Sequence, residues 1–430
     1  MQNKNISYLS DEVSRFVRQG FKPRPARDET LLPSNPAWRR LRQLGTRLWL
    51  DTGSLSEAGE LWTREFDALT TNNTLLNKEV QTGAYDHLIA EAAEMLSQYN
   101  LSPRQKILEL TFILNARHGL RLVSEFDGTV SVEEHTDLAH DVGAAVEYGR
   151  RYHAICPERF VVKIPFTPAG LLATRKLSQM GISVNHTLGF SARQNYVIAR
   201  LARPAYVNVF LGRLNAFVAD NGLGDGKWVG EKAMLASQAA IRDLRETHGL
   251  PTLQIGASFR AGPQVRDLAG IDVMTLPPKV AKEFLDLVLP VDQLQDRTTQ
   301  EYRPVFKEGI DPASVGLATL WDIDAKLVAC VEELAGMELD DFTPDELTRF
   351  FAARGCGDFL VPWSGGQMAA SRKEGKIPRL DNWRELLAAG AIGLDSLMNL
   401  AGLSSFSADQ QAMDDRVATV LNKIPAGTAH

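Results

Sequence analysis

Short apolar runs typical of β-strands alternate with longer runs of helical period from Arg47 onward. The segments between the short runs, such as SPRQKILELTFILNARHG and PAGLLATRKLSQMG, carry apolar residues at helical spacing. This alternation predicts a parallel sheet covered by helices. The eight strand-like runs are RLWLDTG, ALTTNN, LRLVSEF, FVVKIPF, ISVNHTLGF, YVNVFLGR, TLQIGAS and VMTLPP.

Eight strand–helix units favour a closed (β/α)8 TIM barrel, a fold of about 250 residues. The alternative is a doubly wound sheet, which places a glycine-rich GxGxxG turn after an early strand. The first such turn, DTGSLSEAG, lacks that spacing. We therefore predict a barrel over residues 45–336.

The segments outside the barrel are predicted to be helical. Residues 1–44 form an N-terminal helical arm, in which SDEVSRFVRQG is an amphipathic helix and FKPRPARDETLLPSNP an extended linker. Residues 337–430 form a C-terminal helical appendage. Its predicted helices are TPDELTRFFAARG, DNWRELLAAGAIG, LDSLMNLAGL and ADQQAMDDRVATVLNKI, and VPWSGGQMAASRKEGKIPRL is predicted to be a loop.

Polar residues interrupt the predicted strands near their carboxyl ends, where the active sites of barrels form. Alternate residues of a barrel strand face the interior, so the position of each polar residue along its strand assigns it either to the interior or to the side of the helices. His186 faces the helices by this test. The residues assigned to the rim of the interior are Asp51, Asn72, Glu125, Lys163, Asn185 and Thr187. Polar groups that converge inside a barrel cost free energy unless they serve chemistry or satisfy one another.

Lys163 admits a structural and a catalytic interpretation. A lysine in a strand commonly pairs with a carboxylate for stability, and Asp51 and Glu125 also fit such a role. In the catalytic alternative, burial disfavours the ammonium form of a lysine. The neutral amine can then attack a ketone and form a Schiff base, which acts as an electron sink for carbon–carbon cleavage. Asp51 and Glu125 would move the protons.

Two later strand ends carry cations and a hydroxyl group. VNVFLGR ends in Arg213, and IGASFR contains Ser258 and Arg260. Arginine binds phosphate oxygens through a planar, bidentate fork. Beside an imine-forming lysine, this pattern indicates a sugar-phosphate site.

Composition and charge agree with an ordinary globular chain of 430 residues, 44% hydrophobic and 23% charged. The net charge of -6 argues against nucleic acid or an anionic membrane as partner. Cys156, Cys330 and Cys356 are widely spaced and form no metal or disulfide pattern. With no signal-peptide pattern in MQNKNISYLSDEVSRF and no membrane-length apolar run, we expect a cytoplasmic location.

Several motifs occur in order along the predicted barrel and together resemble the transaldolase family of class I Schiff-base enzymes. The motifs are DTG at Asp51, TTN at Asn72, SEFDG at Glu125, VVKIP at Lys163, GISVNHTLGFSARQ with Asn185, Thr187 and Ser191, VFLGR at Arg213, GASFR with Ser258 and Arg260, and LAGIDVMTLPP. The appendage and much of the N-terminal arm lie outside this resemblance.

The resemblance implies a role for each matched residue. Lys163 would be the Schiff-base nucleophile, Asp51 would transfer protons at substrate hydroxyls, and Glu125 with Thr187 would position a catalytic water. The residues implied in binding are Asn72 and Asn185 for the dihydroxyacetone portion, Asn208 in the donor pocket, and Arg213, Ser258 and Arg260 for the phosphate. No metal or organic cofactor is implied.

The implied reaction belongs to the pentose phosphate pathway. A dihydroxyacetone unit passes from a ketose phosphate (sedoheptulose 7-phosphate or fructose 6-phosphate) to an aldose phosphate (glyceraldehyde 3-phosphate or erythrose 4-phosphate). The sequence departs from the family at TTNN, which replaces TTNP, at VKIPFT, which replaces KLAST, and at Asn208, where a serine is common. The sugar preference is therefore left open.

Two other functions remain as alternatives: an aldolase that releases free dihydroxyacetone, and a non-catalytic sugar-phosphate-binding scaffold. The expected partners are sugar phosphates, and neither nucleic acid nor membrane. The appendage either covers the barrel mouth or forms a subunit contact in a homo-oligomer.

Overall fold

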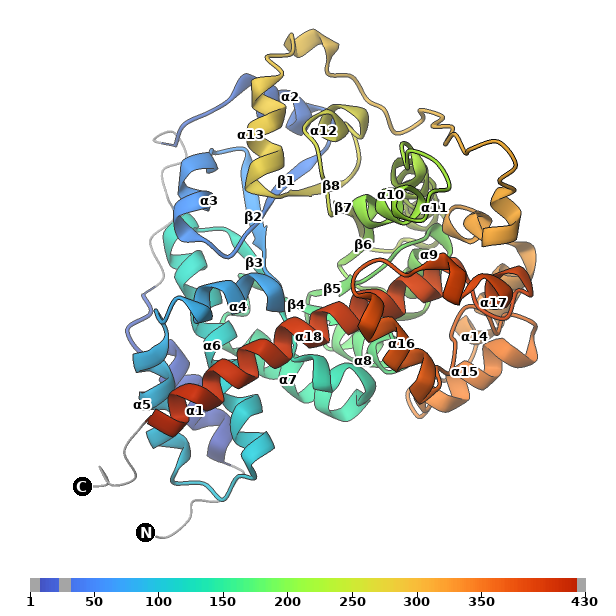
Figure 1. Cartoon of the computed structure of the whole chain (residues 1–430). Helices are drawn as coiled ribbons and strands as arrows, with labels where there is room; N and C mark the ends of the chain where they lie inside the picture. Colours follow the sequence, from blue (N-terminus) through green and yellow to red (C-terminus); the bar gives the residue numbers. More distant parts are fainter. Residues whose placement is uncertain (1–7, 23–31, 424–430) are drawn as a thin grey trace.

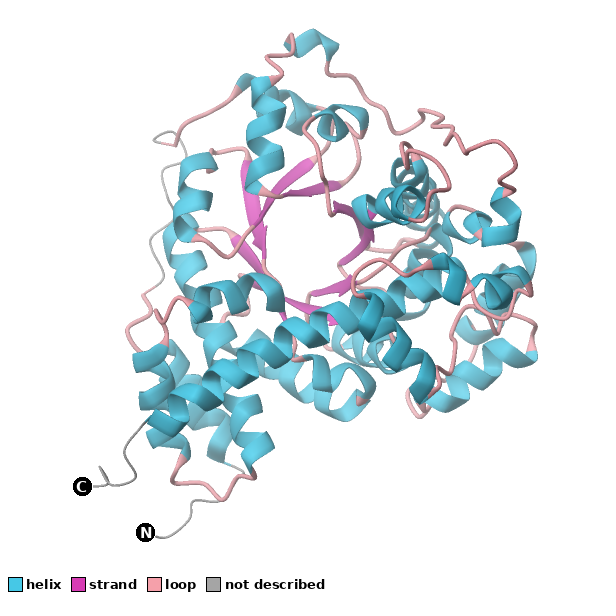
Figure 2. Cartoon of the chain, in the orientation of Figure 1, coloured by secondary structure: helices cyan, strands magenta, loops and turns pink. Residues whose placement is uncertain are grey.

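Eight parallel strands close into a barrel in which each strand pairs with the next and β8 pairs with β1 (Figure 2). The computed structural model describes residues 8–22 and 32–423. The predicted (β/α)8 TIM barrel is confirmed, with additional helices near both ends of the chain. The strands are β1 (Arg47–Asp51), β2 (Phe66–Thr70), β3 (Thr129–Glu133), β4 (Phe160–Pro165), β5 (Val184–Thr187), β6 (Tyr206–Phe210), β7 (Leu253–Ala257) and β8 (Val273–Leu276).

The third predicted strand was wrong. LRLVSEF continues the preceding helix, α6 (Pro103–Phe126), and the strand is the following segment, TVSVE. Leu120, Leu122, Val123 and Phe126 are buried along α6, so their apolar run belongs to a helix enclosed on several sides. The helix ends at Asp127, which adopts a left-handed conformation with φ 51°.

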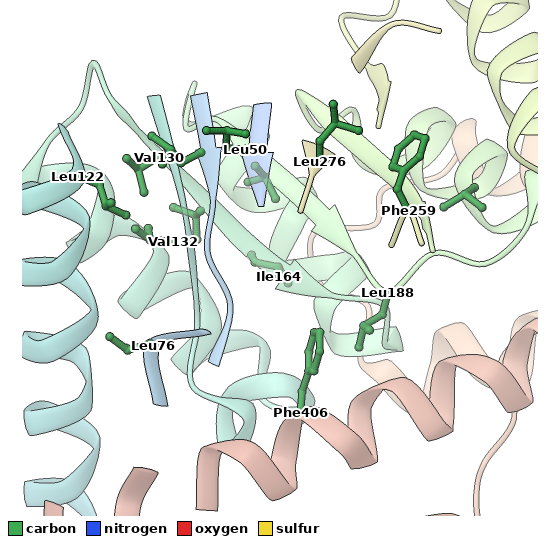
Figure 3. Packing of buried hydrophobic residues seen from close by; sticks show 14 of the residues in the cluster. Leu50, Leu76, Leu122, Val130, Val132, Ile164, Leu188, Phe259, Leu276 and Phe406 are labelled. Carbon is green, nitrogen blue, oxygen red and sulfur yellow. The ribbon is translucent and has the colours of Figure 1, made fainter. Parts of the chain in front are cut away.

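Helices follow the strands along the chain and cover the outside of the barrel (Figure 1). These helices are α3 (Leu55–Leu61), α4 (Asn73–Gln81), α5 (Asp86–Leu96), α6, α7 (Val142–Ile155), α8 (Pro168–Gln179), α9 (Ala192–Ala202), α10 (Leu211–Asp220), α11 (Val229–His248), α12 (Pro263–Asp267) and α13 (Pro278–Asp286), with the short 3-10 helix η3 (Thr136–His140). Outward-facing strand residues such as Leu50, Val130 and Ile164 belong to the main core (Figure 3). Each such side chain, fully buried, contributes about 1.5–3 kcal/mol to stability.

The N-terminal arm begins with a helix, as predicted. Helix α1 (Leu9–Arg18) contacts α6 and α7 and buries Leu9, Val13 and Val17. Helix α2 (Pro36–Gln43) leads into β1, and Asn35 caps it by accepting a hydrogen bond from the backbone N–H of Ala37. Residues 23–31 of the predicted linker lie outside the described residues.

The C-terminal region departs from the predicted elements in two places. The predicted loop contains α16 (Gly365–Glu374), which Ser364 and Gln367 start with reciprocal hydrogen bonds to the backbone. The last two predicted helices form one continuous helix, α18 (Leu394–Lys423). The segment 404–407, SSFS, is helical and joins them. The remaining elements are η4 (Val291–Gln293), η5 (Pro312–Val315), η6 (Leu317–Leu320), α14 (Ala325–Ala335), α15 (Pro344–Ala353), η7 (Leu380–Asn382) and α17 (Arg384–Ala388).

Helix α18 crosses one side of the barrel opening, near the ends of β4 and β5 (Figures 1 and 2). It contacts α4, α5 and α6 along its length. Within residues 8–22 and 32–423, no helix has both the length and the apolar character required to span a bilayer.

Candidate active site

Strand register places three polar residues side by side on neighbouring strands. Glu133 pairs with Lys163 across β3 and β4, and Lys163 pairs with Asn185 across β4 and β5. The Nζ atom of Lys163 lies 3.7 Å from Glu133 Oε1 and donates a hydrogen bond of 3.1 Å to the carbonyl oxygen of Thr71. Lys163 is only 4% exposed, so its amine lies in a largely dry environment. The inward orientation predicted for Lys163 agrees with these contacts.

Glu133, and not Glu125, is the glutamate beside the lysine. Glu125 lies on an exposed face of α6, because the segment assigned to the third strand is helical. Glu133 is 3% exposed and accepts a hydrogen bond of 3.0 Å from the backbone N–H of Asn73. Burial raises the pKa of Glu133, and Lys163 partly offsets the rise. The alternation of polar and apolar residues in TVSVE, which follows an Asp-Gly turn, is the sequence pattern that could have identified this strand and the glutamate at its end.

Asp51 ends β1 at the same rim of the barrel. It pairs with Thr70 of β2 and accepts a 2.8 Å hydrogen bond from the Thr70 hydroxyl. The Thr70 hydroxyl also lies 2.6 Å from that of Thr275, on β8. Burial raises the pKa of Asp51, and the charge of Lys163 works against the rise. Asp51 is thus a candidate proton carrier close to the lysine.

Amide side chains line the rim next to Lys163. Asn185 donates a 3.1 Å hydrogen bond to Ser131 Oγ and accepts one of 3.0 Å from Asn208 Nδ2. This pair of contacts fixes the orientation of the Asn185 amide. Asn72 accepts a hydrogen bond from the backbone N–H of Leu75 and caps α4.

Arg213, Ser258 and Arg260 lie close to one another after β6 and β7. Gly212 makes this approach possible, since a Cβ atom there would lie 2.1 Å from the Ser258 carbonyl oxygen and 2.6 Å from Arg260 Cγ. Burial and the nearby charge of Arg260 lower the pKa of Arg213 to about 10. Arg213 is buried and Arg260 exposed, which leaves the pair open to an anion from one side.

Three buried polar atoms near this rim have no hydrogen-bond partner in the described part of the chain. They are Arg213 Nη1, Ser258 Oγ and Thr187 Oγ1. Buried polar groups are normally paired, so unpaired ones indicate a ligand or water site.

His186 faces the helices as expected, where its Nδ1 lies 2.9 Å from Thr174 Oγ1.

Helix α18 adds one residue that the strand-based prediction missed. The ring centroid of Phe406 lies 5.7 Å from Lys163 Nζ and 5.4 Å from the guanidinium carbon of Arg213. Figure 3 shows this ring projecting from α18 towards Ile164 and Leu188. The helical spacing of Asn399, Gly402 and Phe406 on one continuous helix was the signal for it.

The fold and this rim define an enzyme-type barrel, in which a buried lysine, two carboxyl groups and an arginine pair meet at the carboxyl ends of the strands. The residues 8–22 and 32–423 contain no group of three His, Cys, Asp or Glu side chains placed to hold a metal ion. The chain belongs to the transaldolase/fructose-6-phosphate aldolase family, whose sequence profile matches residues 48–345.

Relatives within this family carry the name transaldolase. The transaldolase of Yersinia pseudotuberculosis serotype IB (strain PB1/+) is 30% identical over 259 residues, which cover 59% of this chain and 80% of the relative. The transaldolase of Hamiltonella defensa subsp. Acyrthosiphon pisum (strain 5AT) is 27% identical over a segment of the same length and coverage. The matched family also contains fructose-6-phosphate aldolases.

Proposed function

We propose that this protein is a transaldolase, which moves a dihydroxyacetone unit from a ketose phosphate to an aldose phosphate through a Schiff base on Lys163. The observation that carries the proposal is the buried Lys163 amine, held 3.7 Å from Glu133 and in register with Asn185. The donor is sedoheptulose 7-phosphate or fructose 6-phosphate, and the acceptor glyceraldehyde 3-phosphate or erythrose 4-phosphate. The expected location is the cytoplasm, in keeping with three free thiols.

The covalent step begins when the Lys163 amine adds to the ketone carbon of the donor. The carbonyl oxygen leaves as water after two proton transfers, and a carbon–nitrogen double bond forms. In the proposal, Glu133 and the Thr187 hydroxyl hold the water that carries these protons. This assigns to Glu133 the role expected of Glu125.

Carbon–carbon cleavage follows from the positive charge of the iminium. Asp51 takes the proton from the donor hydroxyl, an aldose phosphate leaves, and the bond electrons pass to the lysine-bound carbon unit as an enamine. Arg213, Ser258 and Arg260 bind the phosphate, and Asn185 with Asn208 and Asn72 binds the hydroxyl groups of the three-carbon unit. Addition of the acceptor aldose reverses these steps.

Borohydride trapping tests the proposal directly. Reduction in the presence of fructose 6-phosphate is expected to leave a stable adduct on the peptide that contains Lys163. Lys163→Ala is expected to lose the adduct and to lower turnover by on the order of a thousandfold or more, because the covalent route is gone. Lys279→Ala removes a lysine whose side chain is 83% exposed and serves as the control. An adduct on another residue, or full turnover in Lys163→Ala, would contradict the proposal.

Product analysis separates transfer from simple aldol cleavage. With fructose 6-phosphate and erythrose 4-phosphate together, a transaldolase forms sedoheptulose 7-phosphate and little free dihydroxyacetone. Release of free dihydroxyacetone as the main product, with and without the acceptor, would instead assign the chain to the aldolase branch of its family.

A further inference from the structure

The Phe406 ring lies near both the Lys163 amine and the Arg213 guanidinium, two groups that the proposed reaction uses. Its ring centroid is 5.7 Å from Lys163 Nζ and 5.4 Å from Arg213 Cζ, and it meets the Phe210 ring edge to face at 6.4 Å. Phe406 itself is 4% exposed. A large apolar side chain from α18 thus fills the space beside the amine that would carry the substrate.

Two neighbouring residues let α18 lie close enough for this contact. Asn399 donates a 3.1 Å hydrogen bond to the carbonyl oxygen of Leu188, directly after β5. Gly402 faces Leu188 and Arg213, since a Cβ atom there would lie 2.9 Å from Leu188 Cδ2 and 3.5 Å from Arg213 Nη1. A larger residue at position 402 would therefore displace the Leu188 side chain that packs against α18 at this point.

Polar contacts on both sides of Phe406 hold the helix in place. On the N-terminal side, Asp395 accepts hydrogen bonds from Ser191 and Arg193 at 2.7–2.8 Å. On the C-terminal side, Asp414 lies 3.2 Å from His135 and 2.6 Å from Arg104. The ring position is therefore set by the fold and does not depend on a mobile lid.

We propose that Phe406 protects the lysine-bound intermediate from water, and so directs the intermediate to an acceptor sugar instead of to hydrolysis. The inference rests on the proposed transaldolase function and assigns the choice between transfer and release to this residue. The face of an aromatic ring also attracts a nearby cation, which favours the charged iminium over the free amine.

Hydrolysis is the reaction that Phe406 would suppress. After the enamine takes a proton on carbon, a water oxygen adds to the iminium carbon and a proton moves to the nitrogen. The carbon–nitrogen bond then breaks with its electrons on nitrogen, which gives free dihydroxyacetone and the lysine amine. The ring lies 5.7 Å from the nitrogen and limits the entry of further water from the α18 side, beyond the single water assigned to Glu133 and Thr187, and a drier site slows this step.

The test compares two rates in the full chain. Free dihydroxyacetone and sedoheptulose 7-phosphate are measured together, with fructose 6-phosphate as donor and erythrose 4-phosphate as acceptor. Phe406→Ala is expected to raise the ratio of release to transfer about tenfold, and Phe406→Leu, which keeps part of the bulk, about threefold. If the alanine variant does not fold, the Phe406→Leu variant alone tests the inference.

Leu400→Ala is the matched control, because Leu400 is a buried apolar residue of the same helix that is 6% exposed. Its ratio should equal that of the unchanged protein. An unchanged ratio in both Phe406 variants, or an equal rise in Leu400→Ala, would overturn the inference. Absence of a borohydride adduct on Lys163 in the unchanged protein would overturn the proposed function instead, so the two failures are distinguishable.

Discussion

Glu133 is held by one backbone donor and one side-chain cation in a buried position. The Asn73 N–H and the Lys163 ammonium both favour its ionised form, whereas burial disfavours it and raises its pKa overall. A carboxyl group with a raised pKa is a stronger base once it is ionised, which suits it to proton transfer near neutral pH.

Glu133→Gln is expected to lower turnover by about 10²- to 10⁴-fold, since the amide cannot exchange a proton with the catalytic water. Glu125→Gln, on the exposed face of α6, should retain activity close to that of the unchanged protein. Initial rates of transfer measure both. If Glu125→Gln were the inactive variant, the role proposed for Glu133 would be wrong.

The pH dependence of turnover provides a second measurement on the same residue. Because Glu133 acts as a base when ionised and its pKa is raised, turnover should fall on acidification at a pH above the ordinary glutamate value of 4.5. Glu133→Gln should lose the part of this acidic decline that Glu133 causes.

Two elements show why part of the site was predictable from sequence and part was not. The strand FVVKIPF combines a continuous apolar run with one central lysine, so parity alone placed Lys163 inside the barrel. LRLVSEF is also a short, largely apolar run, but it continues α6, and its apolar side chains are buried. A short apolar run fits either a strand or a buried helix, and only tertiary packing distinguishes them.

Helix α18 depends on a buried ion pair for its attachment to the barrel. Arg193 donates to Asp395, which is fully buried, and to Asp358, which is partly buried. Phe406 was missing from the predicted site because it lies far along the chain from the strands, and no strand pattern could reveal this long-range attachment.

Asp395→Ala is expected to destabilise the protein by up to about 3–5 kcal/mol, since it leaves the buried Arg193 guanidinium with Asp358 as its remaining carboxylate partner. Asp415→Ala, at an exposed position of the same helix, should change stability by less than about 0.5 kcal/mol. Chemical unfolding followed by circular dichroism measures both. Equal stability of the two variants would show that the buried pair does not hold α18.

At the scale of the molecule, the barrel and α18 form one continuous core. The main apolar cluster includes Leu50 and Ile164 from the strands together with Leu397, Phe406 and Val417 from α18. Alternation and motif order predicted the barrel because strands and helices repeat locally in the sequence. They left two roles open for the appendage and did not identify α18 as the helix that supplies a residue to the rim. Helix α18 crosses one side of the barrel opening (Figure 1), and it carries Phe406 to the rim.

Glu134 makes the stability of the whole fold sensitive to pH. It is 2% exposed, its Oε1 has no hydrogen-bond partner in the described part of the chain, and burial raises its pKa well above 4.5. The folded state therefore binds this proton more tightly than the unfolded state does. The stability that results is present at low pH and is lost as the pH rises from the unfolded value towards the folded one.

Glu134→Gln removes this titration and is expected to be stabilising at higher pH. Between the unfolded and the folded pKa of Glu134, the gain in the free energy of unfolding over the unchanged protein should grow by up to about 1.4 kcal/mol per pH unit. Thermal unfolding at pH 5, 7 and 9 measures it. A constant difference across these pH values would show that Glu134 titrates as an ordinary exposed glutamate.

The pairing of Arg193 with Asp395 also has a consequence for synthesis. The two residues are separated by 202 positions, so the barrel helix with the arginine leaves the ribosome well before the carboxylate exists. At about 5–20 residues per second, this interval lasts roughly 10–40 s. Asp358 is made 165 positions after the arginine and can pair with it earlier, but until residue 395 is made the arginine lacks its fully buried partner and α18 cannot lie across the barrel opening.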